Sequence, residues 1–262
     1  MADEETSTRG ALPMSNLGQR IVVGALGAGL IVGLALFSRV GTQLLFSLFG
    51  LVALVECLLM RKTARTIEWL APFILAGLVA LVLNAMPPVT GYVALILALA
   101  ILAGFGWRRL VIWLYPSLVT AGIAGINSLL QGGGTILLIL LFVTWATDIG
   151  AYAVGMKFGR RLLAPDISPK KTWEGALGGL AASLAVGVVA GLVTREMYLA
   201  LAMATLAGTA GQIGDLLESI YKREAGVKDS GGILPGHGGI LDRFDAFFYN
   251  ALLFSAILLL AA

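Results

Sequence analysis

The sequence predicts an all-α polytopic integral membrane protein with about nine transmembrane helices, a cytoplasmic N-terminus and a C-terminus outside. Of the 262 residues, 58% are hydrophobic and only 13% are charged, which is too apolar for a soluble domain. Apolar runs of about 20 residues recur along the whole length, as in helical membrane proteins. The alternation of polar and apolar residues that is typical of a membrane β-barrel is not seen.

A polar segment at residues 1–19 comes first, and we expect it to be a disordered cytoplasmic tail. The apolar run that follows is too long for the core of a signal peptide and lacks a small-residue cleavage site, so it should remain as an anchor. The predicted spans are residues 21–38, 43–60, 69–86, 92–105, 110–130, 135–156, 174–194, 197–221 and 244–262. Pro116 and the polar and small residues after it make the fifth span the weakest, and a kinked or partly re-entrant course is open for it.

The charges of the loops set the predicted orientation, because cytoplasmic loops of membrane proteins are rich in Lys and Arg. With the N-terminus inside and nine spans, all but two of the 18 Lys and Arg residues lie on the cytoplasmic side, and the exceptions are Arg39 and Arg195. The net charge of +3 therefore reflects these loops and does not indicate a nucleic-acid partner. Cys57 is the sole cysteine, which excludes an intrachain disulfide and a zinc site built from cysteines.

Small residues recur every four positions in the seventh and eighth spans, which predicts close packing against other helices. We expect both spans to be interior helices, and the two stripes allow a homodimer without requiring one. The stripes are Gly175, Gly179, Ser183, Gly187 and Gly191 in the seventh span, and Ala200, Ala204, Gly208 and Gln212 in the eighth.

The stretch from Ser219 to Asp245 differs from the apolar remainder, since its 27 residues include eight charged side chains, the only histidine and six glycines. Cations, carboxylates and accessible backbone N–H groups together suit a substrate that carries phosphate and a metal ion. A solvated, flexible loop between two helices is the alternative. We favour the binding loop, because the helices on both sides lead acidic residues into it.

Two acids, Asp148 and Asp215, are predicted to lie about 10–14 Å below the cytoplasmic ends of their helices. A carboxylate at that depth is costly unless it faces a polar cavity and is paired or binds an ion. Asp215, Ser219 and Lys222 share one helix face, which leads from the acid to the loop. For each acid the alternative is a salt bridge between helices, with Arg108, Arg109 or Lys157 as the partner.

Asp242 and Asp245 open the ninth span, where either could simply cap the helix. Capping needs only one of them, and with Asp215 they could offer three oxygen ligands to Mg²⁺. Between the sixth and seventh spans, Lys170 and Lys171 supply charge for a phosphate, and Thr172 could cap the next helix. The alternative for this second segment is an ordinary basic cytoplasmic loop.

Two motifs resemble those of the CTP:phosphatidate cytidylyltransferases, also called CDP-diacylglycerol synthases. One is Ser-Pro-Lys-Lys-Thr-x-Glu-Gly, at Ser168 to Gly175. The matching residues of the other are Ser219, Lys222, Arg223, Lys228, Asp229, Pro235, His237, Gly238, Gly239, Asp242, Arg243 and Asp245. Tyr221 departs from the aliphatic residue or Phe expected there, and we expect its hydroxyl to do little harm.

The resemblance implies an enzyme that transfers the cytidylyl group of CTP to phosphatidic acid, giving CDP-diacylglycerol and pyrophosphate for phospholipid biosynthesis. It implies Mg²⁺ as cofactor, with a second cation left open, and a bacterial-type plasma membrane with the active site facing the cytoplasm. Residues 20–134 would then hold about five spans, and residues 135–262 would form a catalytic part of about four spans with cytoplasmic loops at 157–174 and 222–243. Membrane lipid is the expected surrounding partner.

The expected site residues fall into three groups. The expected catalytic residues are Asp215, Lys171, Lys228, Arg243 and Asp148, and the expected metal ligands are Asp215, Asp242 and Asp245. The expected nucleotide- and phosphate-binding residues are Ser168, Lys170, Lys171, Thr172, Lys222, Arg223, His237, Gly238 and Gly239. His237 could bond a phosphate or merely brace the loop.

Two other functions agree less well with the sequence. An ion-coupled transporter would explain acids within the membrane, but it predicts internal repeats and a site at the midplane, whereas the charges here gather at one face. A CDP-alcohol phosphotransferase would carry an Asp-Gly-x-x-Ala-Arg helix motif, which this sequence lacks.

Overall fold

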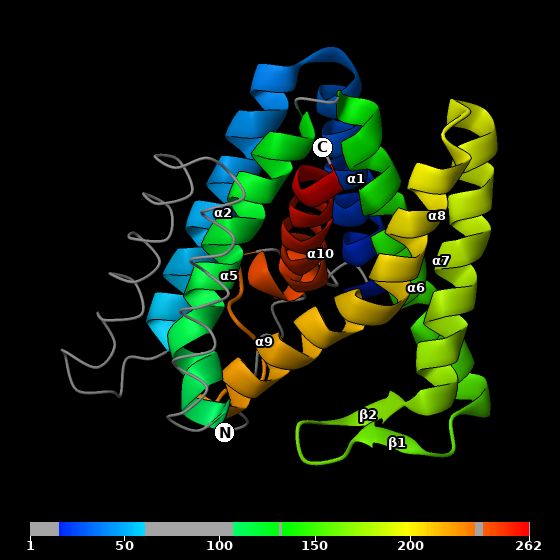
Figure 1. Cartoon of the computed structure of the whole chain (residues 1–262). Helices are drawn as coiled ribbons and strands as arrows, with labels where there is room; N and C mark the ends of the chain where they lie inside the picture. The colour runs from blue at the N-terminus through cyan, green and yellow to red at the C-terminus, as the bar shows by residue number, and fades with distance from the viewer. Residues whose placement is uncertain (1–15, 61–106, 131–132, 234–237, 262) are drawn as a thin grey trace, which may run out of the picture.

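The computed structural model describes residues 16–60, 107–130, 133–233 and 238–261. These residues form a helical bundle with one small β-hairpin at its edge (Figure 1). The elements are α1 (Asn16–Phe37), α2 (Arg39–Met60), α5 (Trp107–Leu129), α6 (Gly134–Phe158), β1 (Leu162–Ala164), β2 (Ser168–Thr172), α7 (Trp173–Thr194), α8 (Met197–Leu206), the π-helical turn η2 (Ala207–Gly211), α9 (Gln212–Glu224) and α10 (Leu241–Ala261).

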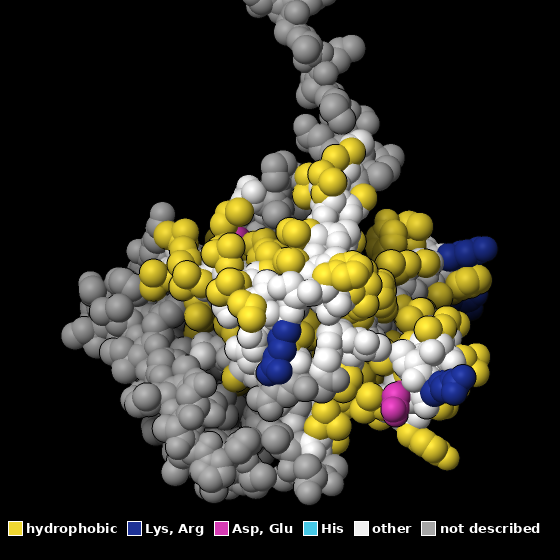
Figure 2. All heavy atoms as spheres, turned by 90° about the horizontal axis from the view of Figure 1, so that it is seen from above, with side chains coloured by type: hydrophobic (Ala, Val, Ile, Leu, Met, Phe, Trp, Pro, Cys, Tyr) yellow, Lys and Arg dark blue, Asp and Glu magenta, His cyan; other side chains and the backbone are white. Residues whose placement is uncertain are grey.

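The membrane character predicted from the sequence is confirmed in its coarse form. Three helices of the described chain, α2, α6 and α7, are long and apolar enough to cross a membrane. Large hydrophobic side chains such as Leu26, Phe37 and Leu192 are exposed on the outside of the bundle. Figure 2 shows one end of the molecule, where hydrophobic side chains cover most of the described surface and charged ones are few. The predicted spans at residues 69–86 and 92–105 lie outside the described residues.

The small-residue stripe of α7 is buried in all five residues and packs closely against other helices, as predicted. Gly175 and Gly179 contact α6, while Ser183, Gly187 and Gly191 contact α8. A Cβ atom on Gly179 would lie 2.8 Å from the carbonyl oxygen of Thr147 in α6, so only glycine lets the two backbones approach this closely. The expectation that this span is an interior helix is wrong within the described chain. Its other faces expose Leu177, Val189 and Val193, and α7 lies at the edge of the bundle (Figure 1).

Helix α5 runs unbroken through Pro116, so the weak fifth span is one continuous helix rather than a re-entrant segment. The glycines that weakened the prediction serve to pack α5 against α10. A Cβ atom on Gly125 would lie 2.5 Å from the carbonyl oxygen of Ala251. The close approach of α5 and α10 surrounds the first turns of α10 with protein.

The predicted eighth span is bent instead of straight. Its first part is α8, and the π-helical turn η2 then redirects the chain into α9, which crosses the lower part of the bundle obliquely (Figure 1). Gln212 stabilises the bend, since its Nε2 atom donates to the carbonyl oxygen of Gly208 at 2.6 Å and to that of Ala176 in α7 at 3.0 Å. Such π-turns often mark functional sites, and this one re-aims the acidic face of α9.

The Ser168–Gly175 motif does not form a simple loop. β1 and β2 pair as an antiparallel hairpin, in which Leu162 faces Thr172 and Ala164 faces Ser168. The hairpin is joined to α7 by Glu174, whose carboxylate accepts hydrogen bonds from the backbone N–H groups of Arg160 at 3.0 Å and Arg161 at 3.1 Å. The strands were not predicted, because three- and five-residue strands rich in polar residues carry little periodic signal.

Candidate functional site

Three carboxylates from two helices come together at the junction of α9 and α10. Asp215 and Glu218 lie one turn apart on α9, and Asp245 lies in the first turns of α10. One oxygen of each carboxylate lies within 4.8 Å of the other two. This acidic cluster (Asp215, Glu218 and Asp245) has a spacing that could hold a shared cation, and three carboxylates this close repel one another unless positive charge neutralises them.

Glu218 is the most buried member of the acidic cluster, with 1% of the residue exposed. One of its oxygens, Oε2, accepts a short contact from Lys222, while Oε1 is buried and has no hydrogen-bond partner among the described residues. A buried carboxylate oxygen without a partner is energetically costly in an isolated protein. It is the kind of atom that a metal ion would satisfy.

Lys171 connects the Ser168–Gly175 motif to α9, the helix that leads into the other motif. It stands near the end of β2, and its Nζ atom lies 2.6 Å from Oδ2 of Asp215. The next residue, Thr172, caps α7, since its hydroxyl accepts a hydrogen bond from the N–H of Gly175 at 3.1 Å. The predicted cap is thus confirmed. The cap holds the end of β2 against α7 and so fixes where Lys171 meets the acidic cluster.

Lys222 is enclosed between two acids instead of being available to a phosphate. Its Nζ atom lies 2.5 Å from Glu218 and 2.8 Å from Asp242, and 12% of its side chain is exposed. Burial by itself lowers the pKa of Lys222, but the neighbouring carboxylates of Glu218 and Asp242 outweigh it and hold that pKa well above its ordinary range. Lys222 therefore stays charged and neutralises the two acids, and its predicted role as a phosphate ligand stays a prediction.

Asp242 lies outside the acidic cluster, to which the other two predicted metal ligands, Asp215 and Asp245, belong. The predicted set of three ligands stays a prediction. Besides Lys222, the oxygens of Asp242 accept hydrogen bonds from the backbone N–H groups of Ser230 at 3.0 and 3.1 Å and of Gly239 at 2.9 Å. Burial raises the pKa of Asp242, but the hydrogen bonds from Lys222 and Gly239 lower it further, so the pKa falls below its usual value. These donors surround the carboxylate at the start of α10.

Glycines hold the chain close to Asp242. Gly238 has φ +85°, a left-handed conformation that side chains disfavour, and a Cβ atom there would lie 2.8 Å from Oδ2 of Asp242. Gly239 is buried. Both glycines were predicted to bind a phosphate, and in the structure they surround a carboxylate instead. His237 lies outside the described residues.

The remaining predicted site residues border the acidic cluster less directly. Asp148 is exposed on α6, and it forms no ion pair with another described residue, so the predicted alternative of a salt bridge with Lys157 is not seen. Lys170, Lys228 and Arg243 are exposed and Ser168 is half-buried. Arg223 donates to the carbonyl oxygen of Val227 at 2.9 Å and so closes the end of α9.

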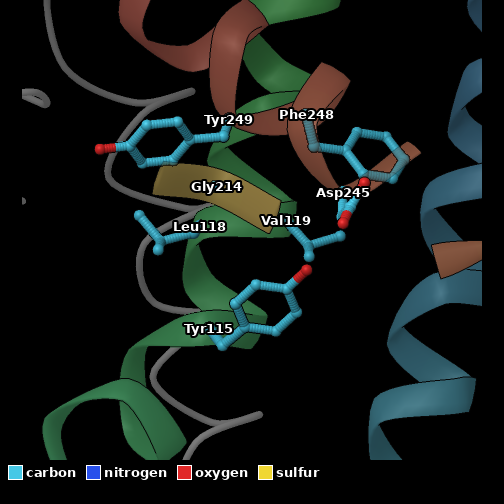
Figure 3. Close-up of a pocket in the computed structure, with 7 residues that line it drawn as sticks. All are labelled: Tyr115, Leu118, Val119, Gly214, Asp245, Phe248 and Tyr249. Atoms are coloured by element: carbon cyan, nitrogen blue, oxygen red, sulfur yellow. The ribbon is translucent and has the colours of Figure 1, made fainter. Parts of the chain in front are cut away.

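A small pocket lies on the far side of Asp245. Figure 3 shows its lining from α5, α9 and α10, with the hydroxyl of Tyr115 pointing toward Asp245. Tyr115 is buried, and its hydroxyl has no hydrogen-bond partner among the described residues. The rest of the lining is mostly apolar and consists of Leu118, Val119, Gly214, Phe248 and Tyr249. Asp245 thus faces the acidic cluster on one side and an apolar wall on the other.

Sequence reasoning missed two acids. Glu218 lies about 60° around the helix from Asp215, yet side chains three residues apart share one helix face. Glu56 was overlooked within the apolar run of α2, where a single charge in an otherwise apolar helix is itself the signal. Glu56 is 1% exposed and contacts the residues that begin α10.

The arrangement brings three carboxylates, two lysines and basic segments from two parts of the chain to one region. Carboxylates that can hold a divalent cation, together with cations that can neutralise phosphate oxygens, are the groups that phosphoryl and nucleotidyl transfer require. Such chemistry depends on positioning and on charge neutralisation.

Comparison with known proteins supports the same assignment. A family model described as "Cytidylyltransferase family" matches residues 18–261. A protein named phosphatidate cytidylyltransferase from Brucella suis biovar 1 (strain 1330) is 37% identical over 252 residues, which is 92% of this chain and 92% of that protein. A protein of the same name from Bacillus subtilis (strain 168) is 49% identical over 127 residues, which is 47% of each chain.

Proposed function

This chain belongs to the cytidylyltransferase family, and we propose that it transfers the cytidylyl group of CTP to phosphatidic acid within a membrane. The products are CDP-diacylglycerol and pyrophosphate, which makes the enzyme a nucleotidyltransferase of phospholipid biosynthesis. The relatives that cover most of the chain carry the name phosphatidate cytidylyltransferase.

The ion pair between Lys171 and Asp215 is the observation that carries the proposal. Lys171 belongs to the Ser168–Gly175 motif, and Asp215 lies four residues before the motif that begins at Ser219. The two residues are 44 positions apart in the sequence, and their ion pair joins the first motif to the acidic cluster. A basic segment and a face that can bind a metal ion, when they meet in this way, suit a nucleoside triphosphate. Its phosphates require both cationic side chains and a metal ion.

We infer that the acidic cluster holds Mg²⁺, and the residues present fit that ion. Three carboxylate oxygens lie close enough to share it, and Oε1 of Glu218 is buried without another partner in the described chain. Mg²⁺ prefers a few carboxylates combined with phosphate oxygens and water. When bound, the ion would neutralise negative charge on the phosphates. A second cation stays open.

In the reaction, an oxygen of the phosphate of phosphatidic acid forms a bond to the α-phosphorus of CTP. The bond from that phosphorus to the bridging oxygen of the β-phosphate breaks, and its electron pair leaves with pyrophosphate. A phosphate monoester is already a competent nucleophile, so no side chain needs to act as a strong base. Lys171, Lys228 and Arg243 would hold the triphosphate and the leaving pyrophosphate. Asp148 stays a predicted member of the site.

We propose the predicted topology of nine spans, with the N-terminus in the cytoplasm and the active site facing it, in a bacterial-type plasma membrane. The hairpin and the C-terminal end of α9 lie toward the same end of the bundle, which supports placing both motifs on one side (Figure 1). The excess of Lys and Arg in these segments supports the cytoplasmic side. CTP would then be available to the site directly.

The test uses purified protein in detergent with phosphatidic acid, labelled CTP and Mg²⁺, and follows CDP-diacylglycerol by thin-layer chromatography. Wild-type protein should form the product, and both EDTA and the substitution Asp215→Asn should abolish it. Lys157→Gln is the matched control, because Lys157 is an exposed basic residue at the end of α6 and lies in neither motif. Folded wild-type protein that forms no product from CTP would contradict the proposal.

A further inference from the structure

Glu56 lies in the apolar helix α2, about 160 residues before the acidic cluster in sequence, yet it contacts the start of α10. Its Oε1 atom accepts a hydrogen bond from the N–H of Ile240 at 3.0 Å, and Oε2 accepts one from the N–H of Leu241 at 2.8 Å. The first N–H groups of a helix have no partner within the helix. Glu56 supplies these partners from another helix, and its negative charge suits the positive end of the α10 dipole.

The hydroxyl of Ser230 gives Glu56 a third hydrogen bond, at 3.2 Å from Oε2. Ser230 follows α9, so one side chain of α2 binds both the segment that leaves α9 and the segment that enters α10. All the groups involved are buried, because Glu56, Ile240 and Leu241 are 1%, 4% and 0% exposed and Ser230 is 6% exposed. Hydrogen bonds to a buried carboxylate are among the stronger ones in proteins.

Glycines in the same segments leave the space that Glu56 fills. A Cβ atom on Gly231 would lie 2.8 Å from Oε1 of Glu56, and one on Gly239 would lie 2.6 Å from Oε2. Larger residues at these positions would push the carboxylate away from the N–H groups of Ile240 and Leu241. Part of the glycine content of this stretch therefore follows from its contact with α2.

Asp242 completes the arrangement from the other side of the chain. The backbone N–H groups of Ser230 and Gly239 donate to Asp242. The hydroxyl of Ser230 and the N–H groups of the two residues after Gly239 donate to Glu56. Two carboxylates thus divide the donors of one segment between them. Asp245 lies one helical turn beyond Leu241, so the position of the first turn of α10 decides where Asp245 meets Asp215 and Glu218.

From this geometry we infer that Glu56 is a positioning residue, which fixes the start of α10 and thereby holds Asp242 and Asp245 in register with α9. Glu56 belongs to neither motif and is not a member of the acidic cluster. The inference rests on the proposed function only for its kinetic part, since the hydrogen bonds to Ile240 and Leu241 can be followed without any turnover.

The experiment compares wild-type protein with Glu56→Gln, Ser230→Ala and Thr42→Val. Gln keeps the size of Glu56 but replaces one acceptor oxygen by an NH₂ group, which only donates. One of the two N–H groups, of Ile240 or of Leu241, then faces a donor instead of an acceptor. Ser230→Ala is the milder variant and removes only the hydroxyl donor. Thr42→Val is the matched control, because Thr42 is fully buried in α2 and its hydroxyl donates to the carbonyl oxygen of Ser38, just before α2, at 2.9 Å.

The first readout is amide hydrogen exchange of the intact protein in detergent, followed in peptides that cover Ile240 and Leu241. Exchange there should be faster in Glu56→Gln than in the wild type and unchanged in Thr42→Val. The second readout is kinetic. We expect kcat to fall on the order of 10- to 100-fold in Glu56→Gln, since misplacement by about 1 Å is that costly, with KM for CTP unchanged.

Ser230→Ala should lower kcat in the same direction by less, and its effect should not add to that of Glu56→Gln, because both act on one contact. Wild-type exchange and wild-type kcat in Glu56→Gln would overturn the inference. An equal loss of kcat in Thr42→Val would show that Glu56 contributes only to general stability. A raised KM for CTP with normal kcat in Glu56→Gln would show that Glu56 contacts the substrate. Either result would also overturn the inference. Should Glu56→Gln not fold, Ser230→Ala decides by the same readouts. A wild type without activity would refute the proposed function, while the exchange measurement would still test Glu56.

Discussion

The Nζ atom of Lys171 lies 2.6 Å from Oδ2 of Asp215, and this contact joins the hairpin to the bent helix α9. Both side chains are part-exposed, at 25% and 34%, so the pair is open to a ligand. An exposed ion pair contributes little to stability, with a median of about 0–1 kcal/mol. The pair instead positions two groups for ligands. A phosphate that enters the site can bind Lys171 in place of Asp215, and a cation can then bind Asp215.

Lys171→Met should lower kcat/KM for CTP by about 100-fold, since the site loses a positive charge aimed at the phosphates. Stability should change little, because the pair with Asp215 is part-exposed. Steady-state kinetics and thermal unfolding in detergent check the two expectations. Lys157→Gln serves as the control, and equal kinetic losses in both variants would show that general surface charge is responsible.

Glu218→Gln and Asp242→Asn should separate a metal ligand from a structural carboxylate. Glu218 belongs to the acidic cluster, so Glu218→Gln should raise the Mg²⁺ concentration for half-maximal activity by about tenfold or more. Asp242 binds Lys222, Ser230 and Gly239, so Asp242→Asn should lower kcat and leave the Mg²⁺ requirement unchanged. Titration of activity with Mg²⁺ measures both, and the reverse pattern would restore Asp242 as the ligand.

The lowered pKa of Asp242 predicts a dependence of stability on pH. Its folded pKa lies below the value of about 3.9 in the unfolded chain, so ionised Asp242 stabilises the fold at every pH above about 4. That contribution is lost as the pH falls through the folded pKa. The difference in Tm between wild type and Asp242→Asn should therefore be constant from neutral pH to about pH 5 and shrink below about pH 4. A difference that stays constant at acidic pH would contradict this.

Gly125→Ala should destabilise the protein by about 1–3 kcal/mol through overpacking. A Cβ atom at this position meets the carbonyl oxygen of Ala251 at 2.5 Å, and a backbone atom cannot move aside as a flexible side chain can. Gly29→Ala is the control, because a Cβ atom on Gly29 would have nothing within 4 Å. Thermal unfolding in detergent should show a lower Tm for the first variant alone.

The element order of the described chain was largely predictable. Spans at residues 43–60, 135–156 and 174–194 agree with α2, α6 and α7 within a few residues, because long apolar runs can only be satisfied as helices in a membrane. The cap at Thr172 and the small-residue packing of α7 were also predictable, since each depends on residues close in sequence or on a strict period of four.

The grouping of the acids was not predictable. Asp242 and Asp245 are three residues apart, yet one binds Lys222 and the other joins Asp215 and Glu218. Which of the two aspartates binds Lys222 and which joins the acidic cluster depends on two features. The π-turn at Ala207–Gly211 changes the direction of α9, and Glu56 fixes the start of α10. Neither effect leaves a periodic pattern in the sequence.

The sequence alone thus determined that the chain is a helical membrane protein with two motifs that resemble a cytidylyltransferase, because composition, apolar run length and motif spacing are local properties. The tertiary structure alone decided that Lys171 meets Asp215, that Glu218 lies beside Asp215 and Asp245, and that Glu56 of α2 contacts the start of α10. The physical reason is that these contacts join residues 27 to 185 positions apart, whose meeting depends on how bent and closely packed helices cross.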